Sequence, residues 1–183
     1  LITDMIKSSD NLYNMLSRLV SSYRYESKQQ ILNLTSCNIN KIIDDVIESL
    51  KNEINSKSMN ISSDLDVKIP NINIDKEEIY KVIYALIDNA IAYTPANGII
   101  NVKSVKQENN IVVSVTDNGP GIPADIKNKI FERYAMAQAI ERKIGAGLNL
   151  YLAKQIIEAH SGKIWFTTER NKGTTFSFML PIS

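Results

Sequence analysis

The sequence has very few residues of the kinds that form disulfides or metal clusters. Of its 183 residues, only Cys37 is a cysteine and only His160 is a histidine. A single cysteine excludes an internal disulfide and a metal site built on several thiolates, and it favours a reducing compartment. A single histidine excludes zinc sites that need two imidazoles. We therefore expect a function that depends on neither kind of cluster.

The chain also lacks an excess of charge and a long apolar run. Its 21 basic and 20 acidic residues give a formal net charge of +1, which argues against nucleic acid or direct membrane contact as partners. No apolar stretch approaches the roughly 20 residues of a membrane-spanning helix. Because the chain begins at Leu1 without a signal peptide, we expect it to be a cytoplasmic fragment. Segments upstream of it could still attach the parent protein to a membrane.

Residues 1–27 contain neither proline nor glycine and predict a long helix. Positions at alternating gaps of three and four form a heptad seam with one polar member: Ile2, Met5, Ser9, Leu12, Leu16, Leu19 and Tyr23. Such a seam is typical of a helical bundle made with another chain or another helix. The alternative is an amphipathic helix packed on its own domain. We favour the bundle.

The hydrophobic pattern of the remaining residues alternates between the period of a helix and the period of a strand, and it predicts an α/β fold. Helices are expected over about 42–54, from an N-cap at Asp75, and after residues 145–147, with a short one at 124–130. Strands are expected near 31–34, 60–67, 99–106, 110–116, 163–168 and 174–181. The sum is a two-layer sandwich of a mixed sheet and three helices, preceded by a separate long helix.

Asp117 is the first candidate functional residue. The alternation of Ile111, Val113 and Val115 places it on the inward face of its strand. A buried carboxylate without a partner is costly, so an acid at this position suggests a ligand.

Two glycine-rich turns, at 117–123 and 145–147, point to a phosphate-bearing ligand, because backbone N–H groups at a helix N-terminus bind anions. Neither turn matches the P-loop or the Rossmann fingerprint, and residues 145–147 are equally compatible with a plain connection. Asn89 and Tyr93 share one helix face. Asn89 is either a solvated asparagine or an oxygen ligand for magnesium beside a triphosphate.

In this order the motifs resemble the ATP-binding catalytic domain of bacterial two-component sensor histidine kinases, of the GHKL or Bergerat type. The segments that carry the resemblance are 86–95, 117–122, 130–134, 145–148 and 173–176. They resemble that family's asparagine box, first glycine box, phenylalanine box, second glycine box and terminal glycine-threonine motif. Residues 24–26 resemble the exit of its dimerisation and histidine-phosphotransfer hairpin. The implied domains are the second hairpin helix at 1–28 and the ATP-binding domain at 29–183.

The resemblance implies ATP and Mg²⁺ as cofactors, with Asn89 on the metal and Asp117 accepting a hydrogen bond from the adenine amino group. Strand alternation places Thr174, rather than Thr175, toward the adenine. Residues 134–143 would be a lid whose start Phe131 anchors. The implied cofactor-binding residues are Asn89, Tyr93, Asp117, Gly119, Gly121, Lys143, Gly145, Gly147, Leu148 and Thr174.

Three positions depart from the family pattern. Ala85 stands where a second asparagine is usual, Ala92 where a lysine is usual, and Lys143 where the second glycine box usually begins. Arg142 and Lys143 are candidates to supply the missing phosphate charge from the lid. The departures leave open two functions: an ATP-dependent protein-histidine kinase, or a degenerate nucleotide-sensing or protein-interaction module of the same fold. The heptad seam argues against a third reading, an ATPase of the chaperone, gyrase or mismatch-repair type.

In the kinase reading, the γ-phosphoryl passes to a histidine on a missing upstream helix, then to a response-regulator receiver domain. The intact hairpin is expected to form a homodimer. His160 lies at the expected end of its helix, so we expect it to have a structural role. This chain would then contain no catalytic residue, and it should not phosphorylate itself. Lys129 and Arg133 are expected to form a solvated helix end.

Overall fold

A computed structural model describes Ser9, Tyr13, Leu16, Ser17 and residues 19–27, 29–133 and 148–182. Its centre is a five-stranded sheet in the order β2-β4-β5-β7-β6. The strands are β2 (Asn60–Leu65), β4 (Ile99–Gln107), β5 (Asn110–Asp117), β6 (Lys163–Glu169) and β7 (Gly173–Pro181). β2 pairs parallel to β4 and every other pair is antiparallel, so the predicted mixed sheet is confirmed.

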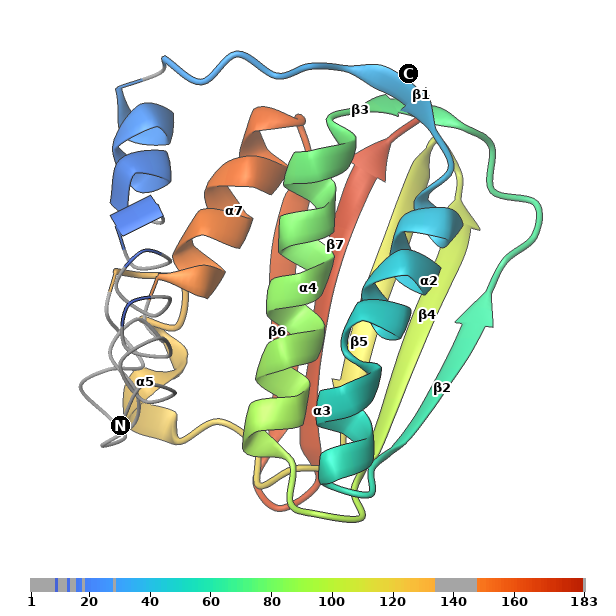
Figure 1. The fold of residues 1–183 in the computed structure, drawn as a ribbon, viewed down its shortest axis with the longest axis vertical. Helices are drawn as coiled ribbons and strands as arrows, with labels where there is room; N and C mark the ends of the chain where they lie inside the picture. The colour runs from blue at the N-terminus through green and yellow to red at the C-terminus, as the bar shows by residue number, and fades with distance from the viewer. Residues whose placement is uncertain are drawn as a thin grey trace.

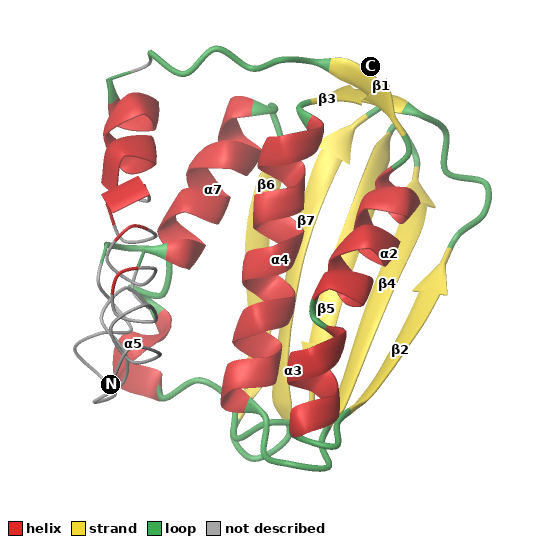
Figure 2. Cartoon of the chain, viewed as in Figure 1, coloured by secondary structure: helices red, strands yellow, loops and turns green. Residues whose placement is uncertain are grey.

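The helices cover one face of this sheet, as Figure 1 shows. They are α2 (Ile39–Ser49), α3 (Lys51–Ser56), α4 (Lys76–Tyr93) and α7 (Asn149–Ala159), with the short α5 (Ala124–Lys127) below α7 in that view. Inward residues of the helices and strands, such as Ile83, Leu86 and Phe178, are fully buried between the two layers. The result is the predicted two-layer α/β sandwich, in which helices and strands are clearly separated (Figure 2).

Side-chain caps begin α2 and α4, and the cap of α4 at Asp75 is the predicted one. The Asn38 side chain accepts a hydrogen bond from the Asn40 N–H at 3.0 Å and caps α2. The Asp75 side chain accepts one from the Glu78 N–H at 3.2 Å and caps α4. The Asn40 side chain donates to the carbonyl oxygen of Asp66 at 3.0 Å, so Asn38 is the residue that caps α2.

The strand predicted at 31–34 is wrong. Residues 29–34 have no regular structure, and Ile31 is 89% exposed. The strand instead begins directly after this segment, as β1 (Thr35–Cys37). It pairs antiparallel with β3 (Ile72–Ile74) in a separate two-stranded sheet. A strand needs a partner, and β3 lies far away in the sequence, so local alternation indicated the wrong residues. The helix predicted at 124–130 is also shorter, and the helix at 42–54 breaks at Leu50.

The described part of the N-terminal helix, which comprises Ser9, Tyr13, Leu16, Ser17 and residues 19–26, presents two different faces. Ser22 and Tyr25 are buried against the rest of the molecule, whereas apolar side chains on another face are exposed. These exposed residues are Tyr13, Leu16, Val20 and Tyr23, at helical gaps of three and four. The helix therefore packs on its own domain through one face and keeps part of the predicted seam exposed. The bundle itself stays a prediction.

Candidate functional site

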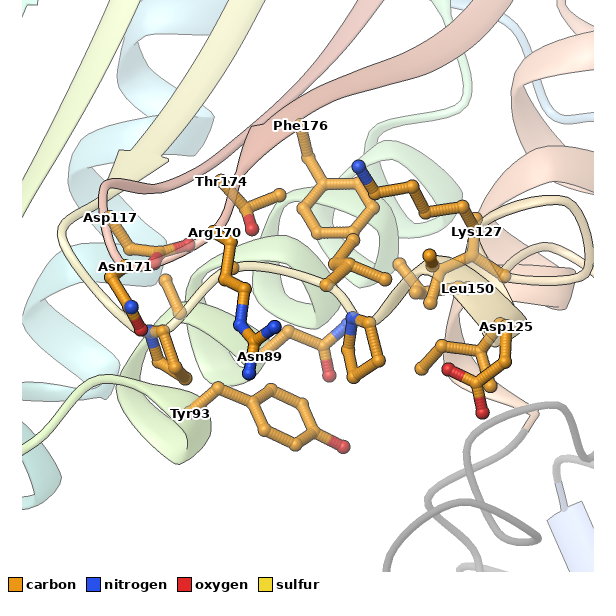
Figure 3. A pocket seen from close by; sticks show the side chains of 18 residues that line it. Asn89, Tyr93, Asp117, Asp125, Lys127, Leu150, Arg170, Asn171, Thr174 and Phe176 are labelled. Atoms are coloured by element: carbon orange, nitrogen blue, oxygen red, sulfur yellow. The ribbon is translucent and has the colours of Figure 1, made fainter.

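A cavity of about 600 Å³ opens between α4, the ends of β5 and β7, and the loop after β5. It is enclosed on its other sides by α5, by the first turn of α7 and by the turn between β6 and β7. Figure 3 shows the labelled side chains that line it, among them Asn89, Tyr93, Asp117, Arg170 and Thr174. Three sequence-distant motifs therefore meet at a single cavity, which makes it the candidate functional site.

Asp117 is 8% exposed at the end of β5 and lines this cavity. Its Oδ1 accepts a hydrogen bond from the Gly119 N–H at 2.8 Å, and the backbone N–H of Thr174 also donates to the carboxylate. Burial raises the pKa of Asp117 above its ordinary value, while the two N–H donors oppose that rise by stabilising the charged form. A partly desolvated carboxylate held in place by the backbone is a good acceptor for a ligand donor.

Thr174 lies directly opposite Asp117 in the pairing of β5 with β7. It is buried and lines the cavity, and its hydroxyl oxygen is 3.1 Å from that of Thr168. Thr175 lies on the other face of the strand, where its hydroxyl is 3.0 Å from that of Thr116. The orientation expected from alternation is therefore observed, and contact with adenine stays a prediction.

The glycines around Asp117 let two turns pack closely. A Cβ at Gly173, whose φ is +111°, would lie 1.8 Å from the carbonyl oxygen of Asp117. A Cβ at Gly121, whose φ is +77°, would lie 2.5 Å from the carbonyl oxygen of Glu169. The structure thus gives these glycines a role in bringing the β6–β7 turn against the loop after β5. The expected approach of Gly119 and Gly121 to a nucleotide stays a prediction.

Asn89 and Tyr93 lie one turn apart on α4 and both line the cavity (Figure 3). The two alanines that depart from the family pattern do not line it. Ala85 is buried beside a second cavity of about 380 Å³, between the N-terminal helix, α4 and α7. Ala92 is exposed. The shared helix face predicted for Asn89 and Tyr93 is therefore confirmed, whereas Ala85 and Ala92 lie in different surroundings.

The structure describes only Leu148, at the end of the second glycine-rich segment. Lys143, Gly145 and Gly147 lie outside the described residues, as do residues 134–143, predicted as a lid. Leu148 is buried at the start of α7, and Leu150 rather than Leu148 lines the cavity. Phe131 packs edge-on against Phe166 and Phe176, with ring centroids 6.0 and 6.3 Å apart, which fixes its position at the end of the described segment.

Lys129 and Arg133 are both exposed, as predicted, but Arg133 also makes specific contacts that the sequence did not predict. Its guanidinium donates to the Ser22 hydroxyl at 2.6 Å, pairs with the Glu26 carboxylate and lies 5.2 Å from the centre of the Tyr151 ring. The Tyr151 hydroxyl donates to Glu26 at 2.6 Å. Arg133 therefore joins the N-terminal helix to α7. The motif spacing held no signal for this role, because all of its partners are distant in sequence.

His160 has the structural role that the sequence predicts. Its Nε2 accepts a hydrogen bond from the Asp75 N–H at 3.0 Å, and its Nδ1 is 2.8 Å from the carbonyl oxygen of Ile156. This pair of contacts assigns the proton to Nδ1. The buried imidazole therefore connects the end of α7 to the start of α4.

The described residues contain no helix that is both long and apolar enough to cross a membrane. Within those same ranges, no group of three or more histidine, cysteine, aspartate or glutamate residues is arranged to hold a metal ion. A cation at the site would need other oxygen ligands.

Residues 74–183 match the family of histidine kinase-, DNA gyrase B-, and HSP90-like ATPases. The adaptive-response sensory kinase SasA of Synechocystis is 40% identical over 139 residues, a match that spans 75% of this chain and 36% of that protein. Full-length ShkA, solved in complex with AMPPNP, superposes over 100% of this chain and 38% of its own, with a TM-score of 0.89 and 22% identity.

The histidine kinase ThkA, solved in complex with the response regulator protein TrrA, is 29% identical and covers 93% of this chain and 49% of its own, with a TM-score of 0.71. This chain thus spans less than half the length of these three proteins. The chain belongs to the histidine kinase-, DNA gyrase B- and HSP90-like ATPase family, and within it is similar to the catalytic parts of named sensory and histidine kinases.

Proposed function

We propose that the domain binds ATP in the 600 Å³ cavity and transfers the γ-phosphoryl group to a histidine on a helix upstream of residue 1. The observation that carries the proposal is the buried Asp117 carboxylate, which faces a cavity formed by α4 and two tightly packed turns. The family membership and the AMPPNP complex of ShkA support ATP as the ligand. Phosphoryl transfer depends mainly on positioning and charge neutralisation, and this cavity brings the Asp117 carboxylate and the Asn89 amide to one site.

Adenine recognition is assigned to Asp117 and Thr174. The free acceptor capacity of the Asp117 carboxylate suits the exocyclic amino group of adenine, because the Gly119 and Thr174 N–H groups occupy only part of it. The Thr174 hydroxyl, 3.1 Å from that of Thr168, is placed to support the same edge of the base directly or through water. Apolar side chains such as Ile122 and Phe176 line the neighbouring walls.

Magnesium is assigned to Asn89. The side-chain carbonyl of Asn89 is a hard oxygen donor at the cavity wall, and magnesium commonly uses few protein ligands together with waters and substrate phosphates. The residues therefore fit a metal that arrives with the nucleotide. Bound there, magnesium would neutralise charge on the phosphates.

Residues 1–28 are assigned to the second helix of the dimerisation and phosphotransfer hairpin, and residues 29–183 to the catalytic domain. The exposed apolar row of Tyr13, Leu16, Val20 and Tyr23 supports a homodimer through this helix. The complex of ThkA with TrrA supports a response-regulator receiver domain as the partner that takes the phosphoryl group. His160 is an unsuitable acceptor, because both ring nitrogens are already hydrogen-bonded. The use of ATP favours a cytoplasmic location.

Titration of the 183-residue chain with ATP, with and without Mg²⁺, tests this function. We expect magnesium-dependent binding, no phosphohistidine on this chain, and phosphohistidine on the full-length protein after incubation with ATP. Absence of ATP binding would overturn the proposal. Magnesium-independent binding without phosphohistidine on the full-length protein would instead favour a degenerate nucleotide-sensing module.

A further inference from the structure

Arg170, in the turn between β6 and β7, extends into the candidate ATP cavity. Figure 3 shows its side chain running from that turn toward Asn89 and Tyr93 on α4. All three residues line the same cavity, together with Asp117. No motif in the sequence singled out this arginine, because its proximity to α4 arises only when the turn folds over the loop after β5.

The turn holds Arg170 in a defined place. The Asn171 N–H donates to the Pro120 carbonyl oxygen at 2.9 Å, and the Lys172 N–H donates to the Glu169 carbonyl oxygen at 3.1 Å. Close contact between Gly121 and the Glu169 carbonyl leaves no room for a side chain between the two turns. The backbone that carries Arg170 is therefore fixed against the loop that borders the nucleotide cavity.

The charges around the turn leave the Arg170 guanidinium available. The neighbouring Lys172 pairs with Glu169 at 2.6 Å, in solvent. Within the described ranges, no ion pair or side-chain hydrogen bond joins Arg170 to another residue. Lys127 is the other described basic residue on the cavity wall, and in Figure 3 its side chain points away from Asn89 and Tyr93.

These observations identify the ligand group that Arg170 meets. A nucleotide whose base lies at Asp117 and whose metal lies at Asn89 must place its phosphates toward Asn89. A guanidinium is suited to such a group, because its planar donors bind phosphate oxygens bidentately. We propose that Arg170 is a phosphate-binding residue for ATP, supplying from the β6–β7 turn a positive charge that α4 lacks at Ala92. This inference rests on the proposed ATP function and deepens it.

Binding of ATP, ADP and adenosine to the wild-type chain and to R170A tests the inference. We expect R170A to weaken ATP and ADP binding roughly 10- to 100-fold, in line with a charge-assisted hydrogen bond, and to change adenosine binding by less than about twofold. R170K should lie between the two, because it keeps the charge and loses the bidentate geometry. K172A is the matched control, since it removes one positive charge from the same turn, and should leave ATP binding within about twofold.

Each result separates this inference from the proposed function. Equal losses of ATP and adenosine affinity in R170A would overturn a phosphate role and point to the base or sugar. Unchanged ATP affinity in R170A, with ATP bound by the wild type, would overturn the arginine inference alone. Failure of the wild type to bind ATP would overturn the proposed function and this inference with it.

Discussion

The two ends of α4 lie in different surroundings, one inside the core and one beside a cavity. At the first end, Asp75 caps the helix, His160 accepts from the Asp75 N–H, and the Tyr25 hydroxyl donates to Glu78 at 2.7 Å. At the last end, Asn89 and Tyr93 face a cavity, and the buried Thr94 hydroxyl has no hydrogen-bond partner among the described residues. The same helix therefore has one end built into the core and one end open to a ligand.

This difference assigns separate tasks to the two ends. Glu78 also pairs with Lys81 at 2.6 Å, and burial together with the Glu78 hydrogen bond raises the pKa of Tyr25 far above its usual value, so its hydroxyl stays a donor. Such satisfied buried groups position the helix. The last end presents Asn89 and Tyr93 to the cavity. Changes at the first end should lower stability, and changes around the cavity should lower affinity.

The largest expected effect is on stability, from His160→Ala. This change removes two buried hydrogen bonds and leaves the Asp75 N–H without its acceptor, so the free energy of unfolding should fall by about 3 kcal/mol. Urea unfolding measures this loss. Glu158→Ala, at an exposed position of the same helix, is the control and should change stability by less than about 0.5 kcal/mol. A marked loss of ATP affinity in folded H160A would contradict the division between the two ends.

The next effect is on affinity, from Asp117→Asn at the cavity. An amide group turned toward adenine cannot accept as a carboxylate does, so ATP affinity should fall by roughly 10- to 100-fold, while the protein stays folded. Calorimetric titration measures the loss. Asp125→Asn makes the same chemical change on an exposed residue of the cavity wall and should alter affinity by less than about threefold. Equal losses in both variants would argue against a specific role for Asp117.

The smallest effect is the pH dependence of stability that Asp117 contributes. Its pKa in the folded protein is raised by burial above the ordinary 3.8, so the folded state binds its proton more tightly than the unfolded state. The stabilisation present below the unfolded pKa is therefore lost as the pH rises through the folded pKa. Urea unfolding at pH 4 and pH 7 should show that D117N gains stability relative to wild type at the higher pH. A loss of stability of D117N relative to wild type between pH 4 and pH 7 would contradict the raised pKa.

Sequence reasoning succeeded where a local period or a short cap decides the structure. Strand alternation placed Asp117 and Thr174 toward the interior, and the structure puts both on the cavity wall. The cap at Asp75 and the helix-closing position of His160 follow from residues within a few positions of each other. Such features depend on neighbouring backbone groups, which the sequence lists directly.

It failed where a residue finds its partner across the fold. The strand expected at 31–34 formed at Thr35–Cys37, because β3 provides its pairing partner there. Arg133 contacts Ser22 and Glu26, more than a hundred positions earlier in the chain. Arg170 reaches the cavity only because the β6–β7 turn packs on the loop after β5. None of these partners leaves a trace in local periodicity.

The sequence by itself determined the α/β class, the inward Asp117, the structural role of His160 and the motifs that carry the resemblance to sensor histidine kinases. These depend on side-chain periods of two and 3.6 and on short polar signals. Only the tertiary structure decided which face of α4 lines the cavity and that Ala85 lies beside a different cavity. It also decided that Arg133 contacts Ser22 and that Arg170 lines the cavity. The physical reason is that burial and long-range contacts come from packing whole elements against one another, which no local stretch of residues specifies.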